Sequence, residues 1–224
     1  RLNSLSPNPF AAFYRIQDKY CLCASPERYL KKEGSSLLSQ PIKGTAKRDL
    51  QNRAQDEKNK QALLNSKKER SENVMIVDLV RNDLSRICAE GSVQVKELFG
   101  IYGFPQVFQM ISSISGTLPE NIHWTDCIKA TFPMGSMTGA PKKRVMELID
   151  ECEGEGRGLF SGSIGYITPE ADFDFNVVIR SIFYDAKAQR LSYAAGGGIT
   201  FYSNAADEYE ECLLKATAIK EALS

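Results

Sequence analysis

The pattern of apolar and polar positions predicts strands first and helices next. Residues 10–24 alternate between apolar and polar side chains around a polar break at 17–19, which is typical of a strand hairpin. The segment 25–27, Ser-Pro-Glu, offers an N-cap, a proline at the first helical position and an acid in the first turn, so a short helix is predicted there. A solvated helix is predicted over about 49–70 and a mostly buried one over 72–88.

The second half of the chain alternates between strand-like and helix-like patterns. The predicted strands are 92–98, 107–115, 159–168, 173–184 and 190–196, with a turn at 185–189 between the last two. The predicted helices are 125–132, 141–152 and 205–222, and a loop of small residues covers 133–142. These elements predict one α+β domain over residues 1–224, with antiparallel sheet flanked by helices.

Composition narrows the class of ligand. The chain is 42% hydrophobic and 25% charged, and its 28 Lys and Arg balance 28 Asp and Glu. There is thus no overall positive field to attract nucleic acid or an anionic membrane, and no apolar run is long enough to span a bilayer. A small-molecule substrate is the better expectation.

The cysteines indicate a reducing compartment. Six are scattered along the chain without a CxxC pair, and there is one histidine, so neither a zinc site nor a disulfide framework is predicted. We expect a cytoplasmic protein. The sequence begins without a methionine, which is expected of a portion of a longer chain.

Lys43 has an unusual local sequence, Gln-Pro-Ile-Lys-Gly-Thr at 40–45. No acidic residue lies within five positions on either side of it. A lysine in a loop bounded by proline and glycine is ordinarily a solvated surface residue. A reactive amine is the alternative that this segment leaves open.

The closing helix carries Glu208, Glu211 and Lys215 on one face. A solvated stripe with a Glu–Lys pair is the ordinary interpretation. The preceding glycines, Gly196, Gly197 and Gly198, leave backbone N–H groups approachable, so a carboxylate could be cradled there while the helix holds a hard cation. Mg²⁺ prefers few protein carboxylates, and Glu72 from another helix could complete the set.

Three further residues suit a polar ligand but also have ordinary interpretations. Thr138 lies in the small-residue loop, where a tight turn before a helix is the alternative to a binding loop. Tyr166 and Arg180 are strand residues whose neighbours are apolar, so they either bind a carboxylate or decorate an exposed face.

Taken together, these segments resemble the chorismate-binding enzyme family. The motifs that carry the resemblance occur in one order and cover almost the whole chain: SPE (25–27), PIKGT (41–45), ENVMIVDLVRND (72–83), GSMTGAPK (135–142), SGSIGY (161–166), IRS (179–181), GGGI (196–199) and ADEYEECLLKA (206–216). The resemblance implies an α/β/β/α chorismate-binding fold, in which antiparallel sheets pack together with helices on their outer faces, and the C-terminal part of a larger chain.

The resemblance also implies a ligand set. Glu72 and Glu211 would hold Mg²⁺ with Glu208 beside them, and the metal would bind the ring carboxylate of chorismate. The expected carboxylate-binding groups are the amides of Gly196, Gly197 and Gly198 together with Tyr166 and Arg180. Thr138 and Lys215 would lie against the ring.

Two residues would carry the chemistry that the resemblance implies. Glu27 matches the acid that protonates the departing C4 hydroxyl. Lys43 stands where anthranilate-forming members have Ala, and it matches the lysine that attacks C2 before ammonia displaces it at C4. The attack needs an uncharged amine, and the absence of a neighbouring acid in the sequence suits that requirement.

The expected reaction is conversion of chorismate and ammonia to 4-amino-4-deoxychorismate, on the route to para-aminobenzoate and folate. A glutamine amidotransferase subunit is the expected ammonia source. Gln109 stands where members commonly have His, and it cannot shuttle a proton, which agrees with a product that keeps its enolpyruvyl group. The alternatives are an anthranilate-forming enzyme and a non-catalytic chorismate- or metal-binding fragment.

Overall fold

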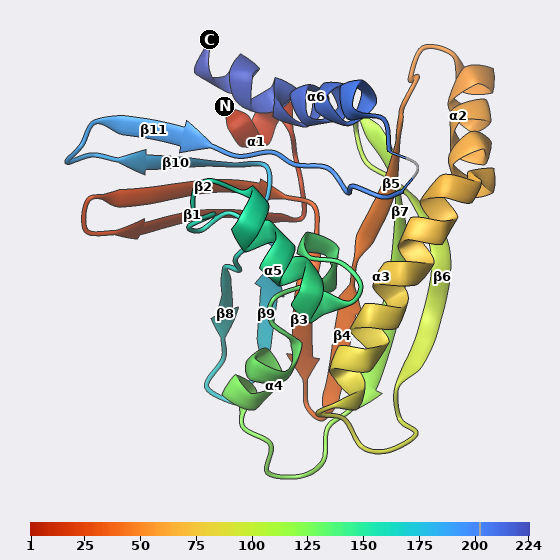
Figure 1. The fold of residues 1–224 in the computed structure, drawn as a ribbon, viewed down its shortest axis with the longest axis vertical. Helices are drawn as coiled ribbons and strands as arrows, with labels where there is room; N and C mark the ends of the chain where they lie inside the picture. The colour runs from red at the N-terminus through yellow and green to blue at the C-terminus, as the bar shows by residue number, and fades with distance from the viewer. Residues whose placement is uncertain (202) are drawn as a thin grey trace. The chain divides into compact units, whose positions relative to one another are not determined.

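A computed structural model describes residues 1–201 and 203–224. The chain divides into two compact units, which we describe separately. Unit 1 consists of Arg1–Pro26, Arg157–Ile164 and Val178–Ser224, and unit 2 of Glu27–Gly156 and Gly165–Val177. Each unit is therefore assembled from segments that are distant in sequence (Figure 1).

Unit 1 contains a four-stranded antiparallel sheet in the order β1-β2-β10-β11. Its elements are α1 (Leu2–Leu5), β1 (Phe10–Ile16), β2 (Lys19–Ser25), β10 (Ser181–Asp185), β11 (Arg190–Tyr193) and α6 (Ala205–Leu223). Cys21 and Cys23 of β2 form a buried cluster with Val178, against which Phe183 of β10 packs. The long helix α6 contacts α1.

Unit 2 contains a seven-stranded antiparallel sheet in the order β5-β7-β4-β3-β9-β8, with β6 paired to β7. The strands are β3 (Arg28–Glu33), β4 (Ser36–Gln40), β5 (Ile42–Lys47), β6 (Gln94–Gly103), β7 (Val107–Thr117), β8 (Gly165–Ile167) and β9 (Phe173–Asn176). The helices are α2 (Arg53–Asn65), α3 (Lys67–Ser85), α4 (Trp124–Thr131), the short 3₁₀ turn η1 (Gly135–Met137) and α5 (Lys142–Cys152). Helices α2 and α3 both contact β5 and β7 (Figure 1).

Two capping residues set the boundary between α2 and α3. Asn52 accepts a hydrogen bond from the Gln55 N–H and begins α2. Ser66 follows α2 and accepts from the Glu69 N–H, so it begins α3. A Ser followed three residues later by Glu is a strong N-terminal signal. The polar stretch predicted as one solvated helix is therefore two, and the buried helix begins at Lys67, earlier than predicted.

The α+β fold class is confirmed, and most local patterns gave the right elements. The hairpin at 10–24, the helices at 125–132, 141–152 and 205–222 and the hairpin that turns at 185–189 all occur within a few residues of their predicted bounds. The domain boundary of 1–224 remains a prediction.

Three local predictions are wrong, because strand pairing overrides local preference. No helix follows 25–27, since residues 28–33 pair with both β4 and β9. The segment 40–45 is not a loop, because Ile42–Lys47 forms β5 and pairs with β7. The predicted strand 173–184 is two strands in different sheets, interrupted at 177–180, where Arg180 has a φ of +53°.

Two predicted strands are shorter than expected. Within 159–168 only Gly165–Ile167 is a strand, because the chain turns back at Ser161, whose φ is +64°. The predicted strand 190–196 ends at Tyr193, before the glycines.

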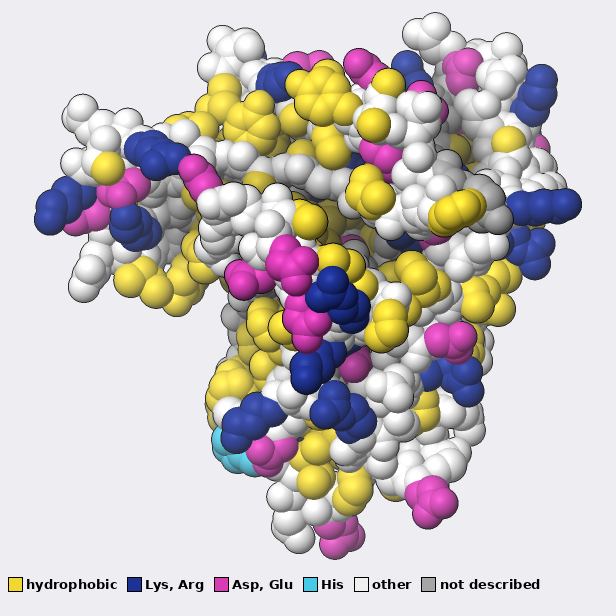
Figure 2. Space-filling view, viewed as in Figure 1, with side chains coloured by type: hydrophobic (Ala, Val, Ile, Leu, Met, Phe, Trp, Pro, Cys, Tyr) yellow, Lys and Arg dark blue, Asp and Glu magenta, His cyan; other side chains and the backbone are white. Residues whose placement is uncertain are grey.

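Charged side chains of both signs are interspersed on the face shown in Figure 2. This distribution agrees with the equal numbers of acidic and basic residues in the sequence. Among the described residues, no helix is both long enough and apolar enough to cross a bilayer.

Candidate functional site

In unit 2, Lys43 forms an ion pair with Glu72, which joins β5 to α3. The Lys43 Nζ lies 3.4 Å from the Glu72 Oε2, and the two side chains are 20% and 10% exposed. Both charges are thus largely removed from water. In such a place each charge of an ion pair depends on its partner far more than it does in an exposed pair.

This geometry corrects part of the sequence-based expectation for Lys43. The lysine is not a solvated loop residue, since it lies on a strand and is mostly covered. The expected absence of a neighbouring acid is also wrong, because Glu72 supplies one from a helix that packs on the strand. Sequence separation conceals a partner that tertiary packing brings close.

Several buried polar atoms on α3 and β7 lack a hydrogen-bond partner among the described residues. They include Oε1 of Glu72, Nδ2 of Asn73 and Oε1 of Gln109. Asn73 uses its other amide atom to accept a hydrogen bond from Ser112 at 2.6 Å. Buried polar groups are usually satisfied, so atoms of this kind mark places where a ligand or ordered water would bind.

Asn73 and Ser112 were not among the predicted site residues. The signal that could have found Asn73 is a polar side chain on the buried face of the amphipathic helix α3. Asn73 is 1% exposed and Ser112 is fully buried. The Asn73–Ser112 hydrogen bond is thus a second polar contact between α3 and the sheet, next to the Lys43–Glu72 ion pair.

The backbone at Gly44 allows α3 to lie close to β5. Its φ is +103°, a conformation that L side chains rarely adopt. A Cβ there would lie 3.1 Å from both the Leu63 Cδ1 and the Glu69 Oε2. The two central residues of the PIKGT motif therefore have different roles. Lys43 forms the ion pair with Glu72, and Gly44 lets α2 and α3 pack closely against β5.

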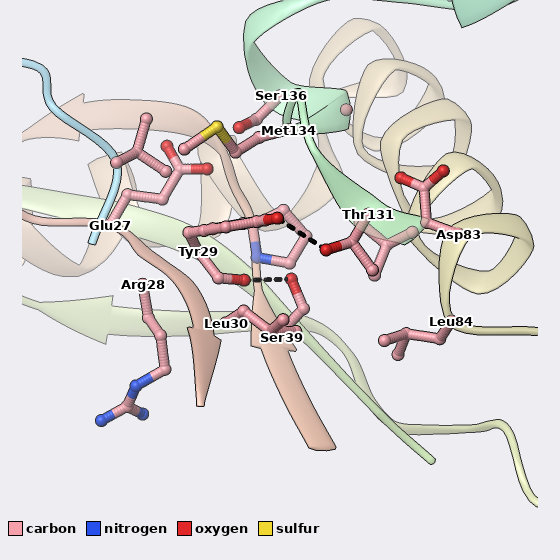
Figure 3. Close-up of a pocket in the computed structure, with 14 residues that line it drawn as sticks. Glu27, Arg28, Tyr29, Leu30, Ser39, Asp83, Leu84, Thr131, Met134 and Ser136 are labelled. Atoms are coloured by element: carbon pink, nitrogen blue, oxygen red, sulfur yellow. Dashed lines mark hydrogen bonds between the residues drawn. The ribbon is translucent and has the colours of Figure 1, made fainter. Parts of the chain in front are cut away.

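Glu27 is 4% exposed and lines a small cavity of about 20 Å³ within unit 2. Figure 3 shows it on the same cavity as Tyr29, Ser39 and Thr131. The Tyr29 and Thr131 hydroxyls are hydrogen-bonded at 2.6 Å, and the Ser39 hydroxyl donates to the Tyr29 carbonyl at 2.7 Å. A cavity of this size has room for about one water molecule.

Thr138 lies just after η1 in the small-residue loop. Its hydroxyl donates to the Met134 carbonyl at 3.0 Å, which satisfies part of that short turn. The ordinary interpretation, a tight turn before a helix, thus describes the local geometry. The hydroxyl retains lone pairs with which to accept from a ligand.

In unit 1, the Glu208 carboxylate lies beside Gly197. Gly197 leaves room for the Glu208 carboxylate, because a Cβ on Gly197 would lie 2.8 Å from the Glu208 Oε2. The Ser203 hydroxyl donates to the other carboxylate oxygen, Oε1, at 2.7 Å. No hydrogen bond in the described part of the chain uses the N–H groups of Gly196–Gly198, which are thus accessible donors.

Lys215 connects the same helix to the glycine segment. Its Nζ lies 2.6 Å from the Glu211 Oε1 and donates to the Gly196 carbonyl at 2.8 Å. Arg180 donates from Nη1 to the Lys215 carbonyl at 2.8 Å. Burial lowers the pKa of the Arg180 guanidinium, and Glu211 acts against that decrease. The predicted residues Gly196, Glu211, Lys215 and Arg180 thus form one connected group.

The predicted site residues fall into two sets. Unit 2 holds Lys43, Glu27, Glu72, Gln109, Thr138 and Tyr166, of which Lys43 and Glu72 are in direct contact. Unit 1 holds Arg180, Gly196, Gly197, Gly198, Glu208, Glu211 and Lys215. Tyr166 on β8 is 64% exposed. Among the described residues, no three His, Cys, Asp or Glu side chains gather as a ready metal-binding group.

Comparison of the whole sequence with known protein families identifies the family of this chain. A family model described as chorismate binding enzyme matches residues 1–221. The chain belongs to the chorismate-binding enzyme family. The resemblance seen in the motifs is thereby confirmed.

Curated relatives in this family include the aminodeoxychorismate synthase component 1 of two bacteria. The protein from Salmonella typhimurium is 44% identical over 219 residues, which cover 98% of this chain and 48% of that protein. The protein from Bacillus subtilis is 40% identical over 222 residues, which cover 99% of this chain and 47% of that protein. This chain therefore spans about half the length of the curated relatives it matches.

Two solved structures share the fold of this chain. Anthranilate synthase component I from Streptococcus pneumoniae superposes with a TM-score of 0.85 at 35% identity, covering 96% of this chain and 47% of that one. The menaquinone-specific isochorismate synthase from Escherichia coli superposes with a TM-score of 0.86 at 20% identity, covering 100% of this chain and 51% of that one. At 20% identity, the second comparison shows the fold alone.

Proposed function

We propose that this chain is the chorismate-aminating part of an aminodeoxychorismate synthase, which converts chorismate and ammonia to 4-amino-4-deoxychorismate. The observation that carries the proposal is the position of Lys43, a primary amine on β5 whose side chain is mostly buried. Relatives at 40–44% identity that are named aminodeoxychorismate synthase component 1 support the same reaction.

Lys43 is the nucleophile in the proposed mechanism. Its Nζ loses a proton to water and then bonds to C2 of the ring. The ring double bonds shift, and the C4–O bond breaks. Glu27 gives a proton to the departing hydroxyl, which leaves as water. Ammonia then bonds to C4, the double bonds shift back, and the Lys43–C2 bond breaks. The new ammonium group on C4 gives its extra proton to Glu27, which restores that acid.

Glu72, Glu208 and Glu211 are the proposed Mg²⁺ ligands. Carboxylate oxygens are ligands that Mg²⁺ prefers, and the ion keeps positions open for substrate and water. The unpartnered Glu72 Oε1 supports this assignment, since Lys43 faces the other oxygen of that carboxylate. When bound, Mg²⁺ would neutralise the ring carboxylate of the substrate and fix its orientation.

The remaining residues bind and orient chorismate in this proposal. The N–H groups of Gly196–Gly198 and the side chains of Arg180 and Tyr166 bind carboxylates, and Thr138 and Lys215 lie against the ring. Gln109 agrees with a product that keeps its enolpyruvyl group, because an amide side chain cannot shuttle the proton that loss of this group would need. A glutamine amidotransferase supplies the ammonia, and the cytoplasm is the proposed location.

The test is product identification by mass spectrometry after incubation with chorismate, ammonium and Mg²⁺. We expect 4-amino-4-deoxychorismate, dependent on Mg²⁺. Anthranilate synthesis is the second candidate, favoured by the 35% identity to an anthranilate synthase structure. Anthranilate is fluorescent and lacks the enolpyruvyl group, so its appearance as the main product would replace the proposal with that activity.

A further inference from the structure

The small-residue loop in unit 2 is closed by one lysine. We define this closed loop as residues 131–142, from the last residue of α4 to the first residue of α5. The Lys142 Nζ donates to the Thr131 carbonyl at 3.2 Å, which joins the two ends of the loop. It also forms an ion pair with Asp83 on α3. One ammonium group therefore holds α3, α4 and α5 together.

Both partners of this ion pair are covered. The Lys142 and Asp83 side chains are 17% and 7% exposed. Burial raises the pKa of the Asp83 carboxyl, and Lys142 acts against that increase. Removing one partner from such a pair leaves a buried charge without compensation, so the two groups depend on each other.

The interior of the closed loop rests directly on α3. A Cβ on Gly135 would lie 3.1 Å from the Leu79 Cβ, so the loop backbone approaches the helix too closely for a larger residue. Met134 is 4% exposed, and its carbonyl accepts the Thr138 hydroxyl. The position of Thr138 thus depends on how firmly the loop is held against α3.

We propose that Lys142 and Asp83 form a clamp that positions the closed loop, and with it Thr138, without contacting the ligand. The loop sequence GSMTGAPK offers Lys142 as an apparent ligand-binding cation, but in the structure its ammonium group donates to two protein oxygens, one on Asp83 and one on Thr131. Helix α3 also carries Glu72, so the same clamp fixes the loop to the helix that pairs with Lys43. The assignment of Thr138 as a substrate contact rests on the proposed function.

Hydrogen exchange measured by mass spectrometry on the full chain without ligand tests the clamp itself. In Lys142→Met, we expect peptides covering 131–142 to exchange at least about tenfold faster, because the loop loses the contact that joins its ends. Lys142→Arg should restore most of the protection, since it keeps the charge and its donors. If Lys142→Met does not fold, Asp83→Asn tests the same pair with little change in shape.

Lys32→Met is the matched control. Lys32 forms a similarly covered ion pair with Asp172 at 2.9 Å, with side chains 12% and 31% exposed, and it joins β3 to the β8–β9 hairpin. We expect this variant to leave exchange at 131–142 unchanged. Unaltered protection in Lys142→Met, or an equal loss in Lys32→Met, would overturn the clamp.

A kinetic measurement separates positioning from ligand binding. With an active wild-type chain, Lys142→Met should raise KM for chorismate more than it lowers kcat, and Lys142→Arg should return KM to within about threefold of the wild type. Equal defects in the two variants, with loop protection intact in both, would assign Lys142 to the ligand and reject the clamp. The exchange result needs no substrate, so it remains informative if the chain does not aminate chorismate.

Discussion

Two lysine–glutamate pairs, one in each unit, differ in what brings them together. Glu211 and Lys215 are neighbours on one helix, and their side chains are 43% and 26% exposed. Lys43 and Glu72 lie on a strand and a helix, and their side chains are 20% and 10% exposed. The first pair follows from helix geometry, whereas the second needs the packing of α3 on the sheet.

The comparison teaches that similar pairs have different consequences. An exposed pair within a helix contributes a few tenths of a kcal/mol and its charges remain solvated. In a covered pair, each charge depends on the other, so any ligand that engages one partner affects its companion. We therefore expect the stability of the fold to be sensitive to substitution of Lys43 or Glu72, and to tolerate substitution within the pair on α6.

The largest stability effect should follow from Lys43→Met. Methionine fills a similar volume, but the Glu72 carboxylate is left buried without a counter-charge. We expect the free energy of unfolding to fall by about 3 kcal/mol, measured by urea denaturation. Lys47→Met, at an exposed position on the same strand, is the control and should change it little. A loss below about 1 kcal/mol for Lys43→Met would mean that the pair behaves as an exposed one.

Gly44→Ala should have the next largest effect in the same region. Its φ of +103° is unfavourable for alanine, and the added Cβ would meet Leu63 at 3.1 Å. We expect a loss of about 2 kcal/mol in unfolding free energy. In unit 1, Gly196→Ala is the matched control, because nothing lies within 4 Å of a Cβ there. Equal losses in both variants would show that close packing at β5 is not the cause.

Gly197→Ala should give a smaller effect in unit 1. The added Cβ would lie 2.8 Å from the Glu208 Oε2, but the end of a glutamate side chain can move. We expect a loss below about 1 kcal/mol in urea denaturation, together with weaker Mg²⁺-dependent chorismate binding in calorimetry. Unchanged binding would indicate that the position of Glu208 does not matter to the ligand.

Lys215→Met should have the smallest effect on stability. Because Glu211 is well exposed, losing the pair leaves a carboxylate that water solvates. We expect a decrease of about 0.5 kcal/mol in the free energy of unfolding, again by urea denaturation. A decrease as large as that of Lys43→Met would remove the distinction between the two pairs.

The features that were predicted correctly from the sequence are those that depend on residues close together in the chain. Residues 10–24 form a hairpin as their alternation indicates, and α6 places Glu211 and Lys215 in contact because they are four residues apart. The fold class and the family were also correctly predicted, because the motifs stay recognisable without any knowledge of packing.

The features that could not be predicted from the sequence are those that depend on contacts between segments far apart in the chain. Residues 28–33 follow a good helix start but form a strand between β4 and β9. Lys43 has no acidic neighbour in sequence, yet α3 supplies Glu72. Asn73 reaches Ser112 across the same interface. Each of these contacts is set by long-range pairing, which hydrophobic periodicity does not encode.

The most direct test of the account is whether Lys43 becomes covalently attached to the ring. Wild-type chain incubated with chorismate and Mg²⁺ without ammonia should gain the mass of chorismate less one water, and peptide mapping should place the addition on Lys43. Lys43→Ala should show no such addition. An adduct that persists in Lys43→Ala, or one that maps to another residue in the wild type, would contradict the proposed nucleophile.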